Sequence, residues 1–383
     1  GNMTWQYGYN ADGSLTTSVD PNGNQSSFGY DAFQRRVAVA QPQPAPGLPQ
    51  PLTTTSFDGQ GRPIAVQDPR GLATLSTLDG IGNLKAYTSP DAGSSSATYD
   101  AAGNLLTRTD ARGKTTTYTY DDLGRPTSIS YASGSATVFE YDGGATPAPN
   151  SKGRLTKITD ESGTTSYTYD ARGRVLTKTQ VVGSGGGAKT FSVVYAWGTS
   201  GAATGKLTSI LYPSGTRVNY GYDTAGRVSS ISLNPVNANG VGTSGIDVPV
   251  LSGVTYNGTN GLLGWTWAGG VAYQRTYDSF GRLKSYPLGN PAGVGIAAGL
   301  VRTLSYDNAG RIIGYTHTNA SGPQAAFDQT FAYDGVDRLI QGSQGGTSVG
   351  YGYDNTGNRT SLSAGSASYA NVVEATSNRL ASV

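Results

Sequence analysis

The chain has no cysteine and a single histidine, His317, among its 383 residues. The absence of cysteine excludes disulfide bonds, thiolate metal sites and a cysteine nucleophile. With no Cys and no second His, the chain lacks most of the residues that form a metal site or support a Ser-His triad. We therefore expect His317 to be an ordinary strand or loop residue, and we expect neither a metal nor a cofactor.

Charge and long apolar runs are also scarce. Charged residues make up 14% of the chain, well below the roughly 25% of a typical globular domain. The net charge is +2 and no stretch is rich in Lys or Arg, which argues against a nucleic-acid partner. No apolar run reaches the ~18 residues of a membrane-spanning helix, and no signal peptide opens the sequence, so we expect no membrane insertion.

Glycine and tyrosine, in contrast, are abundant. The chain has 56 Gly, and its 25 Tyr stand against 8 Phe and 4 Trp. Tyr suits a sheet that is apolar on its face and wet at its edge, because the ring buries area while the hydroxyl reaches water. This composition predicts an ordered protein without a thick, dry core.

A short motif recurs along the whole chain. It consists of an aromatic residue, Asp, two variable residues, Gly, and then Arg, Asn or Lys, as in TTTYTYDDLGR at 115–125. Six of the fourteen intervals between successive motifs equal 21 residues, and a fixed period is the signature of a repeat architecture. With the aromatic position as the marker, the units begin at Tyr9, Tyr30, Phe57, Leu78, Tyr99, Tyr120, Tyr141, Tyr169, Tyr195, Tyr222, Tyr256, Tyr277, Tyr306, Tyr333 and Tyr353.

Each unit contains two turn signals. The first is the Asp-x-x-Gly-Arg segment, and the second, such as DPNG at 20–23 or DPRG at 68–71, places its Gly ten residues after the first one. Gly supplies positive φ, Pro presets the entry of the turn, and the Asp carboxylate accepts hydrogen bonds from turn amides. The residues between the turns alternate with period two and are rich in Thr, Ser, Val, Ile and Tyr, which predicts strands. One unit is therefore a pair of short antiparallel strands.

Neighbouring units are expected to pair edge to edge, because a lone hairpin is only marginally stable. About 30 strands at roughly 4.8 Å spacing make ~145 Å of twisted sheet, too wide for side chains to fill if it closed on itself. We predict an all-β fold: an antiparallel β-ribbon of about 15 hairpin units of ~21 residues, wound into a spiral or a hollow shell or barrel segment. Residues 1–383 would form one continuous array, with insertions near 40–56, 143–152, 180–190, 234–253, 287–300 and 318–328.

The stretch YDAAGNLLTRTDARGKTTTYTYDDLGR at 99–125 strongly resembles the RHS/YD-repeat proteins, and the likeness recurs in every unit. That family includes bacterial RHS polymorphic toxins, the C component of insecticidal toxin complexes and the teneurin adhesion receptors. The resemblance implies a β-ribbon wound into a large hollow shell. In the bacterial members the shell encapsulates a C-terminal toxic effector domain, whereas teneurins use a related barrel as an adhesion scaffold.

The sequence departs from the family at its end. RHS proteins usually close the shell with a core segment that carries DPxG-type motifs and a self-cleaving aspartate, and nothing after Tyr353 resembles it. Self-cleavage and a toxin domain are therefore not implied for this chain. Both ends resemble the inside of a repeat, so we expect a segment of a longer protein.

The Asp and Arg of the motif are interpreted as structural. A catalytic pair would occur once, whereas a pair present in most units serves each unit. Asp completes the turn, and Arg can stack on a neighbouring Tyr or pair with the next Asp. We expect no catalytic residue. The structural motif residues are Tyr120, Asp121, Gly124, Arg125, Tyr169, Asp170, Gly173, Arg174, Tyr222, Asp223, Gly226, Arg227, Tyr277, Asp278, Gly281, Arg282, Tyr306, Asp307, Gly310 and Arg311.

One turn has the ligand spacing of a calcium loop. Asp20, Asn22 and Asn24 stand at the first EF-hand positions, but Gln25 replaces the required Gly and Asp31 replaces the final Glu. We expect an ordinary turn here, with weak calcium binding left open.

Trp265 and Trp267, in GWTWAGG, are two residues apart, so a strand would place both side chains on one face. Large aromatic residues more often pack against neighbouring side chains than form a binding surface for a ligand. We therefore expect these two residues to fill the core beside an irregular unit. The alternative is a stacked surface for a sugar chain, which makes these two residues the candidate ligand-binding residues.

The sequence therefore predicts a structural RHS/YD-repeat module, part of a shell that encapsulates or displays a toxin or effector domain of a larger bacterial secreted or cell-surface protein. Its partner would be the rest of the same polypeptide or another protein. A second interpretation is an extracellular module that binds polysaccharide or protein through the insertion loops, where specificity tends to reside. A weaker third is a lyase-like sugar-active enzyme that uses Tyr and Arg, although no unique residue constellation supports it.

Overall fold

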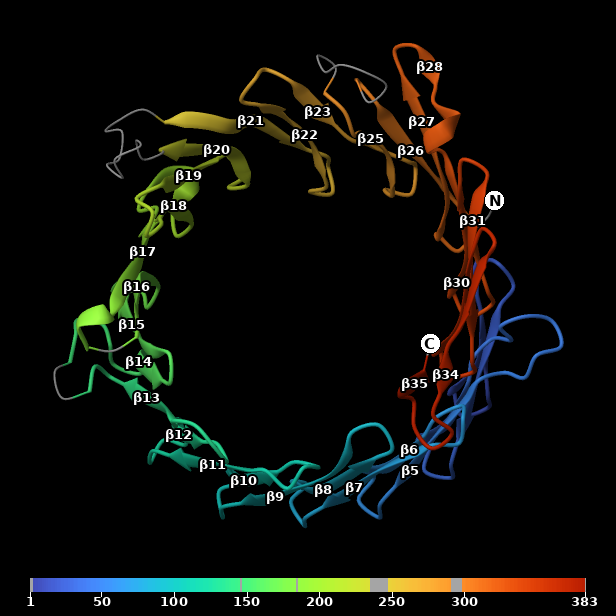
Figure 1. Ribbon diagram of the computed structural model, residues 1–383, viewed down its shortest axis with the longest axis horizontal. Coiled ribbons are helices and arrows are strands. Elements are labelled where there is room, and N and C mark those ends of the chain that lie inside the picture. The colour runs from blue at the N-terminus through green and yellow to red at the C-terminus, as the bar shows by residue number, and fades with distance from the viewer. Residues whose placement is uncertain (1–2, 145–146, 184, 235–246, 291–297, 383) are drawn as a thin grey trace. The chain divides into compact units, whose positions relative to one another are not determined.

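A computed structural model describes residues 3–144, 147–183, 185–234, 247–290 and 298–382 (Figure 1). In this part of the chain the only helical elements are the short 3-10 helices η1 (Gly185–Gly187), η2 (Gly201–Ala203) and η3 (Ala325–Phe327). None of the described helices has the length and hydropathy needed to cross a membrane. The predicted all-β fold is confirmed.

The chain divides into two compact units. Unit 1 comprises Gly1–Thr98, Thr109–Gly113 and Tyr277–Val383, and unit 2 comprises Tyr99–Arg108 and Lys114–Thr276. Strands β9 (Gly93–Tyr99), β10 (Leu105–Thr109) and β24 (Thr276–Tyr277) lie at the boundaries between these segments.

Unit 2 is an antiparallel meander in which each strand from β11 to β23 pairs with the next strand in the sequence. Its strands are β11 (Thr115–Tyr120), β12 (Pro126–Ser130), β13 (Thr137–Tyr141), β14 (Leu155–Asp160), β15 (Gly163–Tyr169), β16 (Val175–Val182), β17 (Lys189–Trp197), β18 (Leu207–Leu211), β19 (Arg217–Tyr222), β20 (Val228–Asn234), β21 (Val248–Tyr256), β22 (Leu262–Trp267) and β23 (Ala272–Gln274).

Unit 1 contains two antiparallel ribbons, which we call the N-terminal ribbon (β1 to β9) and the C-terminal ribbon (β25 to β35). The N-terminal ribbon is built from β1 (Gln6–Tyr9), β2 (Leu15–Val19), β3 (Gln25–Tyr30), β4 (Arg36–Ala40), β5 (Leu52–Phe57), β6 (Pro63–Gln67), β7 (Ala73–Leu78), β8 (Leu84–Ser89) and β9. The C-terminal ribbon is built from β25 (Leu283–Pro287), β26 (Val301–Tyr306), β27 (Ile312–Asn319), β28 (Gly322–Pro323), β29 (Gln329–Tyr333), β30 (Leu339–Gln344), β31 (Thr347–Tyr353), β32 (Arg359–Ala364), β33 (Ala367–Ala370), β34 (Val372–Val373) and β35 (Leu380–Ser382). In the C-terminal ribbon β27 pairs with both β28 and β29, and β34 and β35 form a separate two-stranded sheet.

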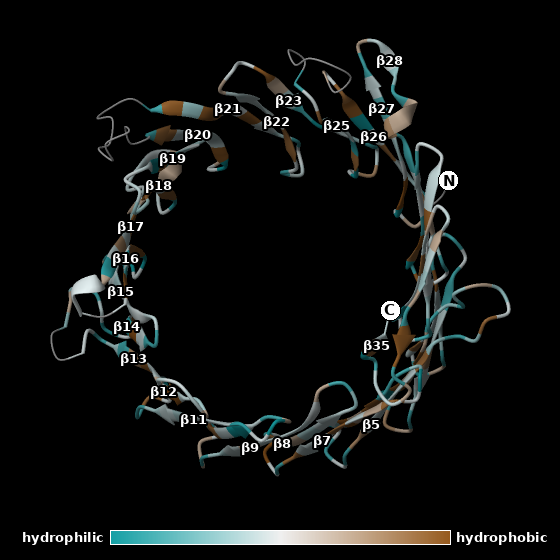
Figure 2. Cartoon of the chain, viewed as in Figure 1, coloured by the Kyte–Doolittle hydropathy of each residue, from teal (hydrophilic) through white to brown (hydrophobic). Residues whose placement is uncertain are grey.

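The strands form because their side chains alternate between two faces. In β11 the side chains of Thr116, Tyr118 and Tyr120 are half-buried, whereas the Thr residues between them are exposed. No second layer covers the half-buried face within the sheet: apart from two prolines, Leu300 and Leu304 are the only apolar side chains that are fully buried among the described residues. Figure 2 accordingly shows hydrophobic residues interleaved with hydrophilic ones along the ribbon. Stability therefore depends on contacts within the sheet and at its turns.

The position of one repeat marker is wrong. The sequence places it at Tyr195, but the strand register shifts between Ala196 and Trp197, as it does at the Tyr-Asp position of other units. The indole Nε1 of Trp197 donates to the backbone oxygen of Val175 at 2.9 Å. Trp replaces Tyr here and Gly198 replaces Asp, so a search for a tyrosine selects the wrong aromatic residue. The N–H of the indole does what the phenol O–H does elsewhere.

The expected insertions coincide only in part with connections between strands, because 52–56 lie in β5 and 318–319 lie in β27. Residues 41–51 separate β4 from β5, and 320–328 carry β28 and η3 after β27. Near 180–190 the strands β16 and β17 extend into the expected insertion and leave only a short connection. Of the insertions expected at 234–253 and 287–300, residues 235–246 and 291–297 lie outside the described residues.

Candidate functional site: the repeated aromatic-Asp-Gly-Arg junction

The motif turn is held by its aspartate. In the unit at Asp121, one carboxylate oxygen accepts hydrogen bonds from the backbone amides of Leu123 (3.0 Å) and Arg125 (2.9 Å). The other oxygen accepts from the Arg125 Nε at 2.6 Å. The amide of Gly124 donates to the Asp121 carbonyl at 2.9 Å, and Gly124 has a φ of 73°, a left-handed conformation that favours glycine. Both carboxylate oxygens are thus used inside the turn.

The same geometry recurs from unit to unit. Arg Nε donates to the aspartate Oδ2 at 2.6–2.8 Å in the pairs Arg35–Asp31, Arg62–Asp58, Arg125–Asp121, Arg174–Asp170, Arg227–Asp223, Arg282–Asp278, Arg311–Asp307 and Arg338–Asp334. Where the motif carries Asn, its Nδ2 takes the place of the guanidinium, as in Asn83–Asp79, Asn104–Asp100 and Asn358–Asp354 at 2.8–3.0 Å.

The motif tyrosine joins its unit to the preceding one. The Tyr120 hydroxyl donates to the carbonyl of Leu105 at 3.0 Å, and Leu105 directly follows the Asn that ends the motif turn one unit earlier. Each such tyrosine stands at a register shift of its strand, and a bulge of this kind re-aims a side chain. The equivalent bonds, at 2.5–3.0 Å, are Tyr30–Leu15, Tyr169–Leu155, Tyr222–Leu207, Tyr256–Val228, Tyr306–Leu283, Tyr333–Ile312 and Tyr353–Leu339.

The motif cation completes the connection from the other side. The guanidinium of Arg125 lies 4.3 Å from the ring centre of Tyr141 in the next unit, and its NH2 donates to Asp142 at 2.8 Å. Cation–ring distances of 4.3–5.8 Å recur in Arg35–Phe57, Arg154–Tyr169, Arg174–Trp197, Lys206–Tyr222, Arg227–Tyr256, Arg282–Tyr306, Arg311–Tyr333 and Arg338–Tyr353. Where the motif ends in Arg or Lys and the next unit has Tyr or Trp at its marker, both contacts join the two units, as at Tyr169, Trp197, Tyr222, Tyr256, Tyr306, Tyr333 and Tyr353.

The electrostatics suit this role. The hydrogen bond from the Arg35 side chain holds the pKa of Asp31 below its ordinary value, against burial that raises it. Burial raises the pKa of the Tyr120 and Tyr222 phenols. The carboxylates thus stay ionised as acceptors and the phenols stay protonated as donors, which is the opposite of a carboxyl or phenol tuned to exchange protons near neutral pH.

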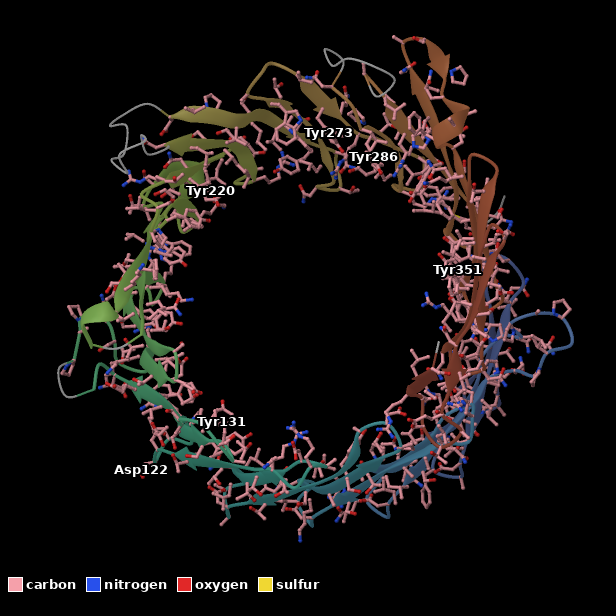
Figure 3. All side chains as sticks on the ribbon, viewed as in Figure 1. Asp122, Tyr131, Tyr220, Tyr273, Tyr286 and Tyr351 are labelled. Atoms are coloured by element: carbon pink, nitrogen blue, oxygen red, sulfur yellow. The ribbon has the colours of Figure 1, made fainter. Side chains whose placement is uncertain are left out.

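The sequence-predicted motif residues are therefore spread along the ribbon, one set per junction, rather than gathered at one site. Figure 3 shows that Tyr220 and Tyr273 of unit 2 lie on one face of the sheet and Asp122 on the other. No group of three His, Cys, Asp or Glu residues that could hold a metal occurs in the described part of the chain. At the turn with calcium-loop spacing, the carboxylate of Asp20 accepts hydrogen bonds from the backbone amides of Asn22 and Asn24.

The two candidate ligand-binding tryptophans lie together on β22. Their ring centres are 5.3 Å apart and the planes meet at 84°. Trp265 also stacks on Tyr273 with ring centres 4.0 Å apart, so one of its faces is covered. Trp267 is 42% exposed and is the ring of this pair that a ligand could reach.

His317 lies on β27 and is 1% exposed. Its Nε2 accepts from the Nε of Arg302 at 3.0 Å, and its Nδ1 lies 3.2 Å from a carboxylate oxygen of Asp328. The same oxygen accepts from the His317 amide at 2.8 Å. These contacts fasten the end of the 320–328 insertion to the sheet, a role that the sequence does not reveal.

The sequence also gives no sign of a second set of contacts inside unit 1, which we call the seam. At the seam, motif turns of the C-terminal ribbon meet the second turns of the N-terminal ribbon, and Figure 1 shows the two ribbons side by side. Asn22 donates to Asp307 at 3.2 Å, and the amide of Gly335 donates to the Pro44 carbonyl at 3.0 Å. Arg70 lies 3.6 Å from the carboxylate of Asp354.

The last turn of the described chain extends the seam. Arg70 donates to the carbonyls of Ser377 and Glu374, both at 2.7 Å. The side chain of Asn378 donates to Asp68 at 2.9 Å, and its amide donates to Asp91. The turn at 68–71 thus contacts both the motif turn at Asp354 and the last turn at 374–378, and Asn378 also reaches Asp91 in the next second turn of the N-terminal ribbon.

These features define a class of protein: a repeat scaffold whose ionisable and aromatic side chains bind neighbouring repeats or their own turns. The family model for the RHS repeat matches residues 9–44, 99–136, 150–188 and 203–234. Over these four stretches the chain is similar to RHS-repeat proteins, as its motif implied. No curated protein shows significant similarity to the sequence.

Solved structures share the fold. The crystal structure of TcdB2-TccC3 has a TM-score of 0.80 at 16% identity, covering 98% of this chain and 23% of that one. A Photorhabdus luminescens Tc holotoxin pore with a mutated TccC3 has a TM-score of 0.80 at 16% identity, covering 98% of this chain and 22% of that one. The chain therefore spans less than a quarter of the length of the proteins whose fold it shares.

Proposed function

We propose that this chain is a structural module, a part of an RHS shell that encloses or displays an effector domain of a larger bacterial secreted or cell-surface protein. The observation that carries the proposal is the repeated junction: Tyr, Asp and Arg of one unit bind the neighbouring unit or their own turn. A side chain used in this way at many positions serves the architecture.

The fold supports the same proposal. Sheets with almost no buried apolar core of their own are poorly explained as an independent globular enzyme, but they suit a wall that separates two spaces. The likeness in fold to TcdB2-TccC3 and to a Tc holotoxin pore supports the proposal, and the matched region makes up 23% and 22% of those chains.

No catalytic activity is proposed. The candidates for acid–base chemistry are the motif Asp and Tyr, and the pKa values of Asp31 and Tyr120 move away from neutrality. His317 is buried between Arg302 and Asp328, where a substrate has no access.

Limited proteolysis of the full-length polypeptide that contains this chain tests the proposal. If the repeats enclose an effector domain, that domain resists a protease in the intact protein and is digested when it is produced without the repeats. Equal cleavage rates in the two settings would exclude enclosure. Cleavage mapped by mass spectrometry separates protection by the repeats from intrinsic resistance of the domain.

A second candidate function is carbohydrate binding, favoured by the exposure of Trp267 beside Trp265. We infer that a sugar ring would stack on Trp267. Titration of oligosaccharides against tryptophan fluorescence tests this with Trp267→Ala, and Trp5→Ala is the matched control because Trp5 is also a half-exposed strand-flanking tryptophan. Saturable quenching that only Trp267→Ala removes supports binding, and its absence from the unsubstituted chain excludes it.

A further inference from the structure

The turn that follows Tyr256 departs from the repeat motif. It reads NGTNG at 257–261, so Asn stands where the motif has Asp and Gly stands where the motif has its cation. The turn is nevertheless held in the same way. The Asn257 Oδ1 accepts hydrogen bonds from the amides of Thr259 (3.0 Å) and Gly261 (2.6 Å), the two positions that a motif aspartate binds elsewhere. The Thr259 hydroxyl donates to the same oxygen at 2.9 Å.

Asn257 is followed by glycine, and an Asn-Gly pair can react with itself. The main-chain nitrogen of the second residue attacks the side-chain carbon of the asparagine, and glycine hinders this attack least because it has no Cβ. Gly258 is exposed, and a Cβ on it would meet no atom within 4 Å. Neither the Gly258 amide nor the Asn257 Nδ2 has a hydrogen-bond partner among the described residues. The attacking nitrogen and the leaving group are thus both unhindered.

Two other Asn-Gly pairs in the described part of the chain, 22–23 and 260–261, are held differently. The glycine amide of the first pair donates to the Asp20 carbonyl at 2.9 Å, and its asparagine side chain donates to Asp307 at 3.2 Å. The glycine amide of the second pair donates to the Asn257 Oδ1 at 2.6 Å. Each of these amides must leave its acceptor before it can attack, so the fold protects both pairs.

We propose that Asn257 is a site of spontaneous deamidation, which supplies the missing motif aspartate. The Gly258 nitrogen bonds to the Asn257 Cγ, its proton passes to Nδ2, and the Cγ–Nδ2 bond breaks to release ammonia and leave a cyclic imide. Water then attacks Cγ and breaks the new Cγ–N bond, which gives aspartate and restores the main chain. The three donors on Oδ1 favour both steps, because each step places negative charge on that oxygen.

The product fits its surroundings. A carboxylate at position 257 accepts from the same amides through stronger, charge-assisted hydrogen bonds. Arg227 of the preceding unit already lies 4.4 Å from the ring centre of Tyr256. At an earlier junction the equivalent Arg125 stacks on Tyr141 and also donates to Asp142, so a cation is in place for the new charge. Deamidation therefore converts an irregular unit into a regular one, whether or not the repeats enclose an effector.

Incubation of the 383-residue chain at pH 8, followed by proteolysis and mass spectrometry, tests the proposal. In the folded chain Asn257 converts about tenfold faster than Asn22 or Asn260, and aspartate exceeds isoaspartate at position 257. In concentrated urea the three asparagines convert at similar rates, because unfolding removes the hydrogen bonds that protect two of them.

The matched control is Gly258→Ala, which keeps Asn257 and adds a methyl group where the fold has room. Circular dichroism checks that this variant is folded, and its Asn257 converts about tenfold more slowly than in the unsubstituted chain. An Asn257 that stays intact in the folded chain, or that converts no faster than Asn22 and Asn260, would overturn the proposal. An unchanged rate in Gly258→Ala, or isoaspartate as the main product of the folded chain, would overturn it as well.

Discussion

Replacing Tyr222 by Phe removes a single hydroxyl from one junction. That hydroxyl donates to the Leu207 carbonyl at 2.6 Å, and the ring, packed under Lys206, is retained. The net contribution of one such hydrogen bond is about 1 kcal/mol. Because repeat arrays are held by contacts between neighbouring units, the loss is expected to be local.

Native-state hydrogen exchange measures this loss unit by unit. About 1 kcal/mol corresponds to a roughly fivefold fall in the protection of amides that exchange through local opening. We expect this fall in β18, β19 and β20 and no change in β11 and β12, two junctions or more away. Tyr212→Phe is the control, since Tyr212 is 41% exposed and belongs to a second turn. Unchanged protection in β18 to β20, or an equal fall in every strand, would refute the junction model.

Three further predictions follow from the same geometry. Phe57→Tyr adds the missing hydroxyl opposite the carbonyl of Arg36 and should stabilise that junction by about 0.5–1 kcal/mol, seen as slower exchange in β4 and β5. The lowered pKa of motif aspartates such as Asp31, Asp121 and Asp170 means that their contribution is full above the ordinary value near 4 and is lost as the pH falls through the folded value. The urea midpoint should therefore be flat from pH 8 to about pH 5 and fall below about pH 4; a midpoint that rises in acid contradicts this. Gly335→Ala places a Cβ 2.0 Å from the Gln43 carbonyl oxygen and should open the seam, with faster exchange at 41–51 but not in unit 2.

The repeat and its turns are predictable from the sequence because their determinants are local. Gly supplies the positive φ, Asp caps the turn four residues before Arg, and alternation of Thr with Tyr sets the faces of the strand. All of these contacts span few residues. The same locality explains the error at Trp197, where a different donor fills the position of the phenol and the sequence search selects Tyr195.

The seam is not predictable in this way. Arg70 in a DPRG turn reads like any other second-turn residue, yet it binds carbonyls more than 300 positions later in the chain. Which turns meet depends on the path of the ribbon, and that path is set by twist accumulated over many strands. For the same reason the sequence, which predicts a strand or loop residue at His317, gives no sign that this residue fastens an insertion through Asp328.

A double-mutant cycle between Arg311 and Tyr333 tests the central claim most directly, that the motif residues join neighbouring units. The guanidinium lies 5.0 Å from the ring centre, and Arg311→Met with Tyr333→Leu removes both partners. The account predicts a coupling free energy of about 0.5–1 kcal/mol in urea unfolding for this pair and none for Arg311 with Tyr353, one unit further along. Equal coupling in the two pairs, or no coupling in either, would contradict it.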